Sequence, residues 1–529
     1  MADGDAGRLT DMPSAPAGPT AGVGSWIERR AAIAPDRLAL VSGGRSLSYA
    51  ELAGRIRRLA NGLRGLGVGR GDRVAWLGPN HPAFLEAFFA SNLAGAAIAP
   101  VNHRLRPDEV RAVLDDTEPA VAIVHDVRGV DAMAGSVRRR IVVEDGTDEG
   151  AAGGLVYEAL VAESPDHLIE ASAGMDDLCM LPHTSGTTGA PKGIMLTHAN
   201  LTWNVVNLLS CVDFRADDVT IAIAPFFRVG GTGVNVLPVL FLGGTVIVPE
   251  DPAPDELLQL MQRHRVTVGF GNPDGLDALV RSPLWPSVDL SSIRFVLTGG
   301  APVPERLIRT YGERGVALVQ GYGLSEAAPF VMVLDPARAR DKIGAAGRPA
   351  MFVDVRIVDP DGGDAKPGAT GELLVRGPNV MAGYWNRPDD TRRVLSADGW
   401  LRTGDAARRD DDGDLWIVGR VADRFVSAGL PVDPGDVERV LLDHPAIADA
   451  GVTVLPASFD GGSDAVVALV VLSEPGAAAE QDVLAFGRAR LATHQAPTAV
   501  RFVDRLPRTS VGKLIRSDLR PLAASLPPP

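Results

Sequence analysis

Short apolar segments alternate with helix-like segments in the part of the chain before residue 350, and this alternation constrains the fold more than any other feature. The apolar segments are 72–78 (DRVAWLG), 121–124 (VAIV), 140–143 (RIVV), 220–224 (TIAIA), 245–249 (TVIVP) and 294–300 (RFVLTGG). Between them lie segments such as 256–264 (ELLQLMQRH), whose apolar residues recur at helical spacing. The pattern predicts an α/β fold with largely parallel sheets, in which ligands bind beyond the carboxyl ends of the strands.

Two segments predict particular helices. Ser48 and Glu51 have the spacing of a capping box, and an apolar series at helical spacing follows them: Leu52, Ile56, Leu59 and Leu63. Glycines at 65, 67 and 69 end that pattern. The most apolar long run, 83–101, contains Glu86, Ser91, Asn92 and Pro100, so it predicts a buried helix rather than a membrane span.

The character of the chain changes near residue 350, where short strands and turns replace helices. Segments 353–363 (VDVRIVDPDGG), 371–377 (GELLVRG) and 412–420 (DGDLWIVGR) predict a smaller β-rich unit. A new α+β pattern begins after Asp423, with a helix at 437–442 and strands at 451–455 and 465–472. We therefore expect a disordered leader at 1–22, an N-terminal domain at 23–422 with a β-rich sub-barrel from about 350, and a C-terminal domain at 423–529.

The composition excludes several classes of function. Lys and Arg total 52 against 66 Asp and Glu, so the formal net charge is −14 and a general nucleic-acid binder is not expected. Two cysteines, Cys179 and Cys211, and nine scattered histidines give neither a disulfide framework nor the spacing of a zinc site. No signal peptide and no membrane span are predicted, so a cytoplasmic location is expected.

The segment His183–Gly193 (HTSGTTGAPKG) combines glycines, hydroxyl groups and one lysine. Glycine lets backbone N–H groups turn toward a phosphate, hydroxyl groups donate hydrogen bonds to its oxygens, and Lys192 supplies positive charge. It is not a Walker A loop, because Gly193 stands where that motif needs Ser or Thr, and the dinucleotide motif G-x-G-x-x-G is also missing. Composition alone leaves a phosphate loop and a flexible surface turn equally open.

Seven segments in order along the chain carry a family resemblance. They are TSGTTGAPKG (184–193), LTGGAP (297–302), GYGLSE (321–326), GELLVRGPNVMAGYW (371–385), GWLRTGD (399–405), GRVADRFVSAG (419–429) and PRTSVGK (507–513). With them the chain resembles the adenylate-forming superfamily of acyl-CoA synthetases, luciferases and peptide-synthetase adenylation domains. The resemblance covers roughly residues 25 to 520.

The resemblance implies a fold and a reaction in two halves. The fold is a large N-terminal domain of two α/β lobes and a small β-barrel, followed by a mobile α+β lid. In the first half-reaction a carboxylate attacks the α-phosphate of MgATP and gives acyl-AMP and pyrophosphate. In the second, a thiol, commonly that of CoA, attacks the mixed anhydride.

The resemblance also assigns nucleotide contacts. They are Thr184, Ser185, Gly186, Thr187, Thr188 and Lys192 for the phosphates; Gly300, Ala301, Tyr322, Gly323 and Ser325 for AMP, with Tyr322 stacked on adenine; and Asp405 and Arg420 for the ribose. Glu326 is implied to be catalytic by holding Mg²⁺, a hard cation that prefers oxygen ligands. A structural tyrosine at 322, a buried N-cap aspartate at 405 and a surface carboxylate at 326 are the alternatives.

The C-terminal domain is implied to carry the catalytic Lys513, which would stabilise the charge that develops between the substrate carboxylate and the α-phosphate. A solvated lysine is the alternative.

Asp423 matches the hinge about which the lid rotates. Another lid surface, with Ser427, Ala428 and Gly429, would line the tunnel for CoA. Relatives often have glycine at the position of Ala428 and polar residues after Gly429, where this chain has Leu-Pro, so the efficiency of the second half-reaction is left open.

The acyl pocket is implied by Phe227, Arg228, Gly231, Gly269, Gly271 and Gly321. Relatives that activate amino acids place an aspartate in the segment where this chain has Arg228, so an amino-acid substrate is not expected. Glycines leave volume, which predicts an apolar pocket for a bulky acid, including cyclic ones. Two alternatives stay open: the glycines serve only turns, and Arg228 either attracts a polar substrate group or points to solvent.

The function expected is therefore that of an acyl-CoA ligase that uses ATP, Mg²⁺ and CoA. The alternatives are an adenylation enzyme that loads the thiol of a carrier protein, an enzyme specialised for one half-reaction, and a non-catalytic nucleotide-binding relative; a luciferase-like oxygenase is a remote fourth. Lys192, Glu326, Asp405 and Lys513 are all present, which disfavours the non-catalytic alternative. Many relatives form homodimers, so a homodimer is one possibility, but the sequence alone does not determine the oligomeric state.

Overall fold

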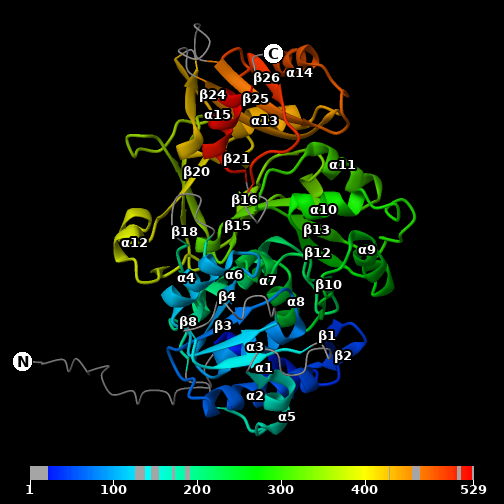
Figure 1. The fold of residues 1–529 in the computed structure, drawn as a ribbon, viewed down its shortest axis with the longest axis vertical. Helices are drawn as coiled ribbons and strands as arrows, with labels where there is room; N and C mark the ends of the chain where they lie inside the picture. Colours follow the sequence, from blue (N-terminus) through cyan, green and yellow to red (C-terminus); the bar gives the residue numbers. More distant parts are fainter. Residues whose placement is uncertain are drawn as a thin grey trace, which may run out of the picture.

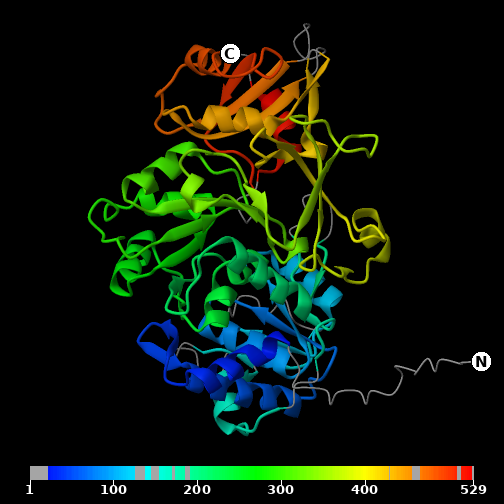
Figure 2. The ribbon, with the colours of Figure 1, turned by 180° about the vertical axis from the view of Figure 1, so that it is seen from behind.

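The computed structural model describes residues 22–125, 137–144, 154–169, 173–184, 191–427, 429–455, 465–508 and 514–526. Two α/β lobes and a smaller C-terminal unit follow one another along the longest axis of the molecule (Figure 1). The view from behind shows the same order, with the β-rich segment beside the junction of the second lobe and the C-terminal unit (Figure 2). Most of the predicted leader, residues 1–21, lies outside the described residues.

The first lobe is built on a sheet of eight strands among the described residues, in the order β19-β9-β8-β4-β3-β5-β6-β7. Their bounds are β3 (Arg73–Leu77), β4 (Ala97–Val101), β5 (Val121–Val124), β6 (Arg140–Val142), β7 (Leu155–Val156), β8 (Leu178–Met180), β9 (Ile194–Thr197) and β19 (Gly383–Tyr384). The helical elements η1 (Val23–Ser25), α1 (Trp26–Ile33), α2 (Tyr49–Gly65), α3 (Pro82–Leu93), α4 (Pro107–Thr117) and α5 (Tyr157–Glu163) accompany it. Strands β3 to β8 pair in parallel, as the alternation predicts.

The second lobe contains a sheet of nine strands among the described residues, in the order β16-β15-β14-β13-β12-β10-β11-β1-β2. Their bounds are β1 (Leu38–Ser42), β2 (Arg45–Ser48), β10 (Val219–Ile221), β11 (Thr245–Ile247), β12 (Val268–Gly271), β13 (Phe295–Thr298), β14 (Ala317–Gly323), β15 (Phe330–Val333) and β16 (Arg348–Pro349). The helices are α6 (His198–Cys211), α7 (Val229–Gly233), α8 (Val236–Leu242), α9 (Pro254–Arg263), α10 (Pro273–Val280), α11 (Glu305–Glu313), η4 (Ser325–Ala327) and η5 (Pro336–Arg338). The six strands from β14 to β1 are parallel to their neighbours, and the remaining strands at both edges are antiparallel.

The remaining chain forms the β-rich segment and the C-terminal unit. Strands β17 (Asp354–Val358), β18 (Gly371–Arg376), β20 (Leu401–Arg409) and β21 (Leu415–Arg420) make an antiparallel sheet next to α12 (Pro388–Val394). After η6 (Val421–Asp423), the C-terminal unit contains β22 (Phe425–Ser427), β23 (Leu430–Val432), α13 (Pro434–Leu442), β24 (Ile447–Leu455), β25 (Ala465–Leu472), α14 (Glu480–Arg488), β26 (Ala499–Phe502) and α15 (Arg516–Ser525). The exact domain bounds stay predictions.

The capping box is present, whereas the single helix expected at 83–101 is wrong. Ser48 Oγ accepts a hydrogen bond from the Glu51 N–H at 3.2 Å, and the Glu51 carboxylate accepts one from the Ser48 N–H at 2.7 Å. The apolar run instead forms α3 and then β4, because the chain turns at Gly95 with φ +88° and the residues after it pair with β3 and β8. No helix in the described ranges is long and apolar enough to cross a membrane.

The apolar α3 packs in the core of the first lobe and contains one buried charge. Glu86 is 1% exposed and accepts hydrogen bonds from Arg55 at 2.7 and 2.9 Å and from the Tyr157 hydroxyl at 2.7 Å. These bonds explain how a carboxylate is retained inside an apolar helix. In the second lobe a separate core forms between the sheet and helices α9, α10 and α11.

Candidate nucleotide and acyl-substrate site

Tyr322 and Asp405 meet where the second lobe contacts the β-rich segment. Tyr322 lies near the carboxyl end of β14, and Asp405 and Arg420 are paired residues of β20 and β21. The Tyr322 hydroxyl donates a hydrogen bond of 2.5 Å to Asp405 Oδ2, and Arg420 Nε lies 3.0 Å from Asp405 Oδ1. The sequence assigned these three residues to adenine and ribose, and the structure brings them together.

The surroundings of Tyr322 keep its hydroxyl group protonated. Burial, followed by the charge of Asp405, raises the pKa of Tyr322, so its hydroxyl stays a donor at neutral pH. Thr403 Oγ1 accepts a hydrogen bond of 3.0 Å from the Asp405 N–H, and the Thr403 carbonyl accepts one of 2.9 Å from Arg420. Asp405 is 9% exposed and belongs to a strand, so the alternative of a helix N-cap does not apply.

Glu326 and Lys192 are connected through Tyr384. The Tyr384 hydroxyl donates a hydrogen bond of 3.0 Å to Glu326 Oε1, and Lys192 Nζ lies 5.2 Å from the centre of the Tyr384 ring. Lys192 Nζ is also 3.1 Å from Asp390 Oδ2 of α12. Burial, followed by the charge of Glu326, raises the pKa of Tyr384, which keeps the hydroxyl protonated. One aromatic side chain, that of Tyr384, therefore contacts both the carboxylate of Glu326 and the cation of Lys192.

The base of the phosphate loop is a short antiparallel pairing. The Thr184 N–H donates to the Lys192 carbonyl at 3.0 Å, and the Lys192 N–H donates to Thr184 Oγ1 at 3.3 Å. His183 and Gly193 form an antiparallel bridge outside this pair, and His183 Nε2 lies 3.1 Å from Asp116 Oδ2. The predicted residues Ser185, Gly186, Thr187 and Thr188 lie outside the described residues. The described ends of the loop therefore place Lys192 beside Thr184.

The residues predicted for AMP on β13 and β14 follow the second-lobe sheet. Gly300, with φ +82°, and Ala301 lie in the loop after β13, and Gly323 ends β14. A Cβ added at Gly323 would lie 1.9 Å from the Pro329 carbonyl oxygen, so close packing alone requires glycine there. Ser325 begins η4, which also carries Glu326. Their contacts with a nucleotide stay predictions.

The carboxylate of Glu326 is suited to serve as one ligand of Mg²⁺. Its Oε1 accepts the bond from Tyr384, while Oε2 has no hydrogen-bond partner among the described residues, and the side chain is half-buried. A carboxylate with one free oxygen, beside a site for phosphates, matches the way Mg²⁺ is held by one or two carboxylates and the substrate. In the described ranges, a separate group of carboxylates, Asp410, Asp412 and Asp414, forms ion pairs with Lys342 and Arg338.

The acyl-pocket segment lies around α7, and one predicted feature needs correction. Side chains alternate along β12. A Cβ added at Gly269 or Gly271 would contact Val296 at 3.6 Å or Leu276 at 2.8 Å, both in the core under α9 to α11. The free volume expected beside Gly271 is therefore filled by Leu276.

The residue on the other face of β12 is Phe270, which the sequence analysis missed. A Cβ added at Gly230 of α7 would lie 3.5 Å from the Phe270 ring, so this ring faces α7. Gly231 itself is required by packing, since its Cβ would lie 2.0 Å from the Pro225 carbonyl oxygen. The signal for Phe270 was the single aromatic residue between the two glycines of VGFG.

The other predicted acyl-pocket residues occupy different environments. Phe227 is buried and packs edge-on against His103, with ring centres 5.6 Å apart. Arg228 is half-buried, and burial, with the neighbouring Arg104, lowers its pKa. The side chain therefore does not extend freely into solvent. Gly321 lies within β14, where a Cβ would be 3.2 Å from the Met332 carbonyl oxygen.

The predicted hinge residue Asp423 is held by an arginine of the C-terminal helix. Arg516 Nε lies 2.9 Å from Asp423 Oδ2, and two further nitrogens of Arg516 donate to Glu438 at 2.7 Å each. Ser427 and Gly429 border the β22–β23 turn, with Gly429 at φ +77°. Ala428 and the predicted catalytic Lys513 lie outside the described residues.

Comparisons with known proteins agree over nearly the whole chain. Residues 27–385 match the pattern of the AMP-binding enzyme family, and residues 436–513 match that of the AMP-binding enzyme C-terminal domain. A feruloyl-CoA synthase of Amycolatopsis sp is 44% identical over 94% of this chain and 98% of its own length. An indoleacetate–CoA ligase of Aromatoleum aromaticum is 39% identical over the same shares of the two chains.

A solved structure is similar throughout its length. The anthranilate CoA ligase AuaEII in complex with anthranoyl-AMP has a TM-score of 0.89 and 26% identity, over 96% of this chain and 99% of that one. The residues of the seven sequence motifs thus belong to a fold that is shared along its full length.

Proposed function

The chain belongs to the AMP-binding enzyme family, and we propose that it activates a bulky, mainly apolar aryl acid as the acyl-AMP and then transfers the acyl group to CoA. The observation that carries this proposal is the convergence of Tyr322, Asp405 and Arg420 in one group and of Glu326, Tyr384 and Lys192 in another. The first suits a nucleoside and the second a charged polyphosphate. Intact polar groups of both kinds disfavour a non-catalytic relative.

In the proposed first half-reaction, an oxygen of the acid carboxylate forms a bond to the α-phosphorus of ATP. The bond from that phosphorus to the bridging oxygen breaks, and pyrophosphate leaves with the electron pair. Lys192 and the phosphate loop bind the β- and γ-phosphates, and Glu326 would hold Mg²⁺, which neutralises phosphate charge. Asp405 accepts hydrogen bonds from the ribose hydroxyls, and Lys513 stabilises the charge that develops at the reacting centre.

In the proposed second half-reaction, the sulfur of CoA, as the thiolate, attacks the acyl carbon and AMP leaves. The C-terminal unit turns about Asp423 so that Ser427, Ala428 and Gly429 replace the Lys513 segment at the site. A carrier-protein acceptor, a homodimer and a cytoplasmic location stay predictions.

Two features support an aryl acid. Phe270 faces α7, and the buried Phe227 comes just before α7 in the chain. Aromatic rings therefore border the segment assigned to the acyl group. The names of the relatives above refer to ferulate, indoleacetate and anthranilate, which are all aryl acids. Arg228, the N-cap of α7, has the opposite charge to the aspartate that binds an α-amine in relatives, so an α-amino acid is not the expected substrate.

A panel of acids tests this substrate class. ATP–pyrophosphate exchange is measured with ferulate, indoleacetate, benzoate, hexanoate and palmitate. We expect exchange with the aryl acids to exceed that with the alkyl acids by about tenfold or more in kcat/KM. The variant Phe270→Ala should reduce that preference, whereas Phe352→Ala, at an exposed phenylalanine elsewhere, should not. A preference for palmitate would contradict the proposal.

A further inference from the structure

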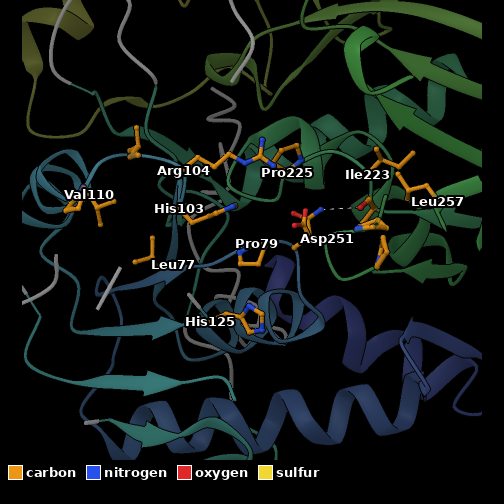
Figure 3. A pocket seen from close by; sticks show the side chains of 16 residues that line it. Leu77, Pro79, His103, Arg104, Val110, His125, Ile223, Pro225, Asp251 and Leu257 are labelled. Carbon is orange, nitrogen blue, oxygen red and sulfur yellow. Dashed lines mark hydrogen bonds between the residues drawn. The ribbon is translucent and has the colours of Figure 1, made fainter. Parts of the chain in front are cut away.

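A cavity of about 810 Å³ lies between the two α/β lobes, next to the acyl-pocket segment that contains Pro225 and Phe227 (Figure 3). Its walls include residues that directly follow β3, β4 and β5 of the first lobe and β10 and β11 of the second. Tyr322, Glu326, Asp405 and Lys192 are not among its lining residues. The cavity is therefore a concave region at the carboxyl ends of parallel strands, apart from the nucleotide contacts.

The strand order makes this position a place where ligands bind in α/β folds. In the first sheet β3 lies between β4 and β5, and in the second β10 lies between β11 and β12. At each of these points the connections leave the sheet in opposite directions, which opens a crevice outside the carboxyl ends of the strands. Here two such crevices face each other across one cavity.

Two opposite charges enter the cavity from different lobes. Arg104, which follows β4, has no hydrogen-bond or ion-pair partner for its guanidinium in the described part of the chain. Asp251, which follows β11, likewise has no side-chain partner among the described residues, so the two do not pair with each other. Figure 3 shows Arg104 and Asp251 reaching the same cavity. Arg104 suits a carboxylate, and Asp251 accepts a hydrogen bond from a hydroxyl group.

The walls of the cavity also offer apolar surface. The apolar lining includes Pro79, Leu105, Ile223 and Pro225, which are partly exposed. The imidazole rings of His103 and His125 add flat surfaces: His103 packs edge-on against Phe227, and His125 stacks on His81 with ring centres 4.4 Å apart. A ligand that fills the space must therefore be apolar in the middle and polar at both ends.

We propose that this interlobe cavity binds a small aryl carboxylate with a hydroxyl group at its far end, the carboxylate at Arg104 and the hydroxyl at Asp251. The site lies outside the adenylate-forming machinery and does not depend on the proposed function. Asn80 connects it to the acyl-pocket segment, because its side chain bonds to the carbonyls of Ala222 and Ala224 and to the N–H of Phe226.

The test is a calorimetric titration of the full chain with 4-hydroxycinnamate while the adenylate site is filled. A saturating cinnamoyl sulfamoyl adenosine, a stable mimic of an acyl-adenylate, fills that site, and its own titration reports separately whether the adenylate site exists. We expect one 4-hydroxycinnamate per chain. Arg104→Gln should weaken its affinity by about tenfold, the factor for loss of one charge-assisted hydrogen bond. Arg106→Gln, a nearby exposed arginine outside the cavity lining, should bind like the wild type.

A second comparison tests the other end of the ligand. Cinnamate, which lacks the hydroxyl group, should bind the wild type as weakly as 4-hydroxycinnamate binds Asp251→Ala, and Asp251→Ala, which has no acceptor, should not discriminate between the two acids. Both substituted side chains are exposed, so circular dichroism should show an unchanged fold. No second binding event in the presence of the mimic, or binding that is equal in wild type and Arg104→Gln, would overturn the proposal.

Discussion

The hydroxyl group of Tyr384 donates a hydrogen bond to Glu326 Oε1 over 3.0 Å, while the ring of the same tyrosine lies 5.2 Å from Lys192 Nζ. Tyr384 belongs to the short strand β19, which pairs with β9 directly after the phosphate loop. One side chain therefore ties the base of that loop to the carboxylate proposed to hold Mg²⁺.

Tyr384→Phe should impair adenylation without unfolding the protein. The phenyl ring keeps its contact with Lys192, but Glu326 loses the donor that orients its carboxylate. We expect kcat/KM for ATP–pyrophosphate exchange to fall about three- to tenfold, and the Mg²⁺ concentration that gives half-maximal rate to rise. Equal rates and equal Mg²⁺ dependence in variant and wild type would show that this bond does not position Glu326.

Tyr322→Phe should weaken ATP binding through Asp405. The variant keeps an aromatic ring for adenine but removes the 2.5 Å hydrogen bond to Asp405 Oδ2. Isothermal titration should show an affinity for ATP about tenfold lower than that of the wild type. Tyr311→Phe is the matched control, since this buried hydroxyl bonds to the Leu276 carbonyl in the same lobe. An equal loss in both variants would indicate general destabilisation instead.

His198 should make the stability of the protein fall in mild acid. Burial lowers its pKa from 6.5 to about 4, and its Nδ1 accepts a hydrogen bond from the Val23 N–H at 3.1 Å, so the folded protein holds the neutral ring. The unfolded chain takes up a proton below pH 6.5, which favours unfolding progressively until about pH 4. The contribution that is lost across this window is about 3 kcal/mol.

The check for His198 is the thermal unfolding midpoint between pH 7.5 and pH 4. His198→Gln should show a flatter dependence on pH than the wild type, even where its absolute stability is lower. His167→Gln, at an exposed histidine, should follow the wild-type curve. Parallel curves for His198→Gln and wild type would mean that other groups set the acid sensitivity.

Arg516→Gln should destabilise the C-terminal unit. Glu438 is 6% exposed, and burial raises its pKa although Arg516 donates two hydrogen bonds to it. Removing the cation leaves a buried carboxylate unpaired, which typically costs about 3–5 kcal/mol. Hydrogen exchange should accelerate in α13 and α15 of this variant but not in the first lobe. Arg520→Gln, at an exposed position of the same helix, should leave exchange unchanged.

Much of the fold follows from local sequence patterns. The apolar segments at 72–78, 121–124 and 294–300 contain β3, β5 and β13, and the capping box at Ser48 begins α2, because these signals act within a few residues. The run at 83–101 forms α3 and β4 and not the single helix predicted, because hydrophobicity alone does not separate a buried helix from a buried parallel strand. Only the turn at Gly95 and the pairing of β4 with β3 and β8 divide it.

The candidate site could be predicted in its residues but not in all of its contacts. The family motifs identified Tyr322, Asp405 and Arg420 as nucleotide contacts. The structure brings these residues together on β14, β20 and β21, although β14 is far from the other two strands in the sequence. The role of Tyr384 was missed, because its contact with Glu326 depends on the pairing of β19 with β9. The space expected at Gly271 also required the structure, since which face of β12 meets the core depends on register.

The most direct test of the proposed function separates the two products. The wild type and Lys513→Ala are incubated with MgATP and the best acid from the panel, with and without CoA, and mass spectrometry measures acyl-AMP and acyl-CoA. We expect the wild type to form acyl-AMP without CoA and acyl-CoA with it, and Lys513→Ala to lose acyl-AMP formation by a factor of about 100 or more. Acyl-AMP that is never converted to acyl-CoA, or adenylation that survives Lys513→Ala, would contradict the proposed function.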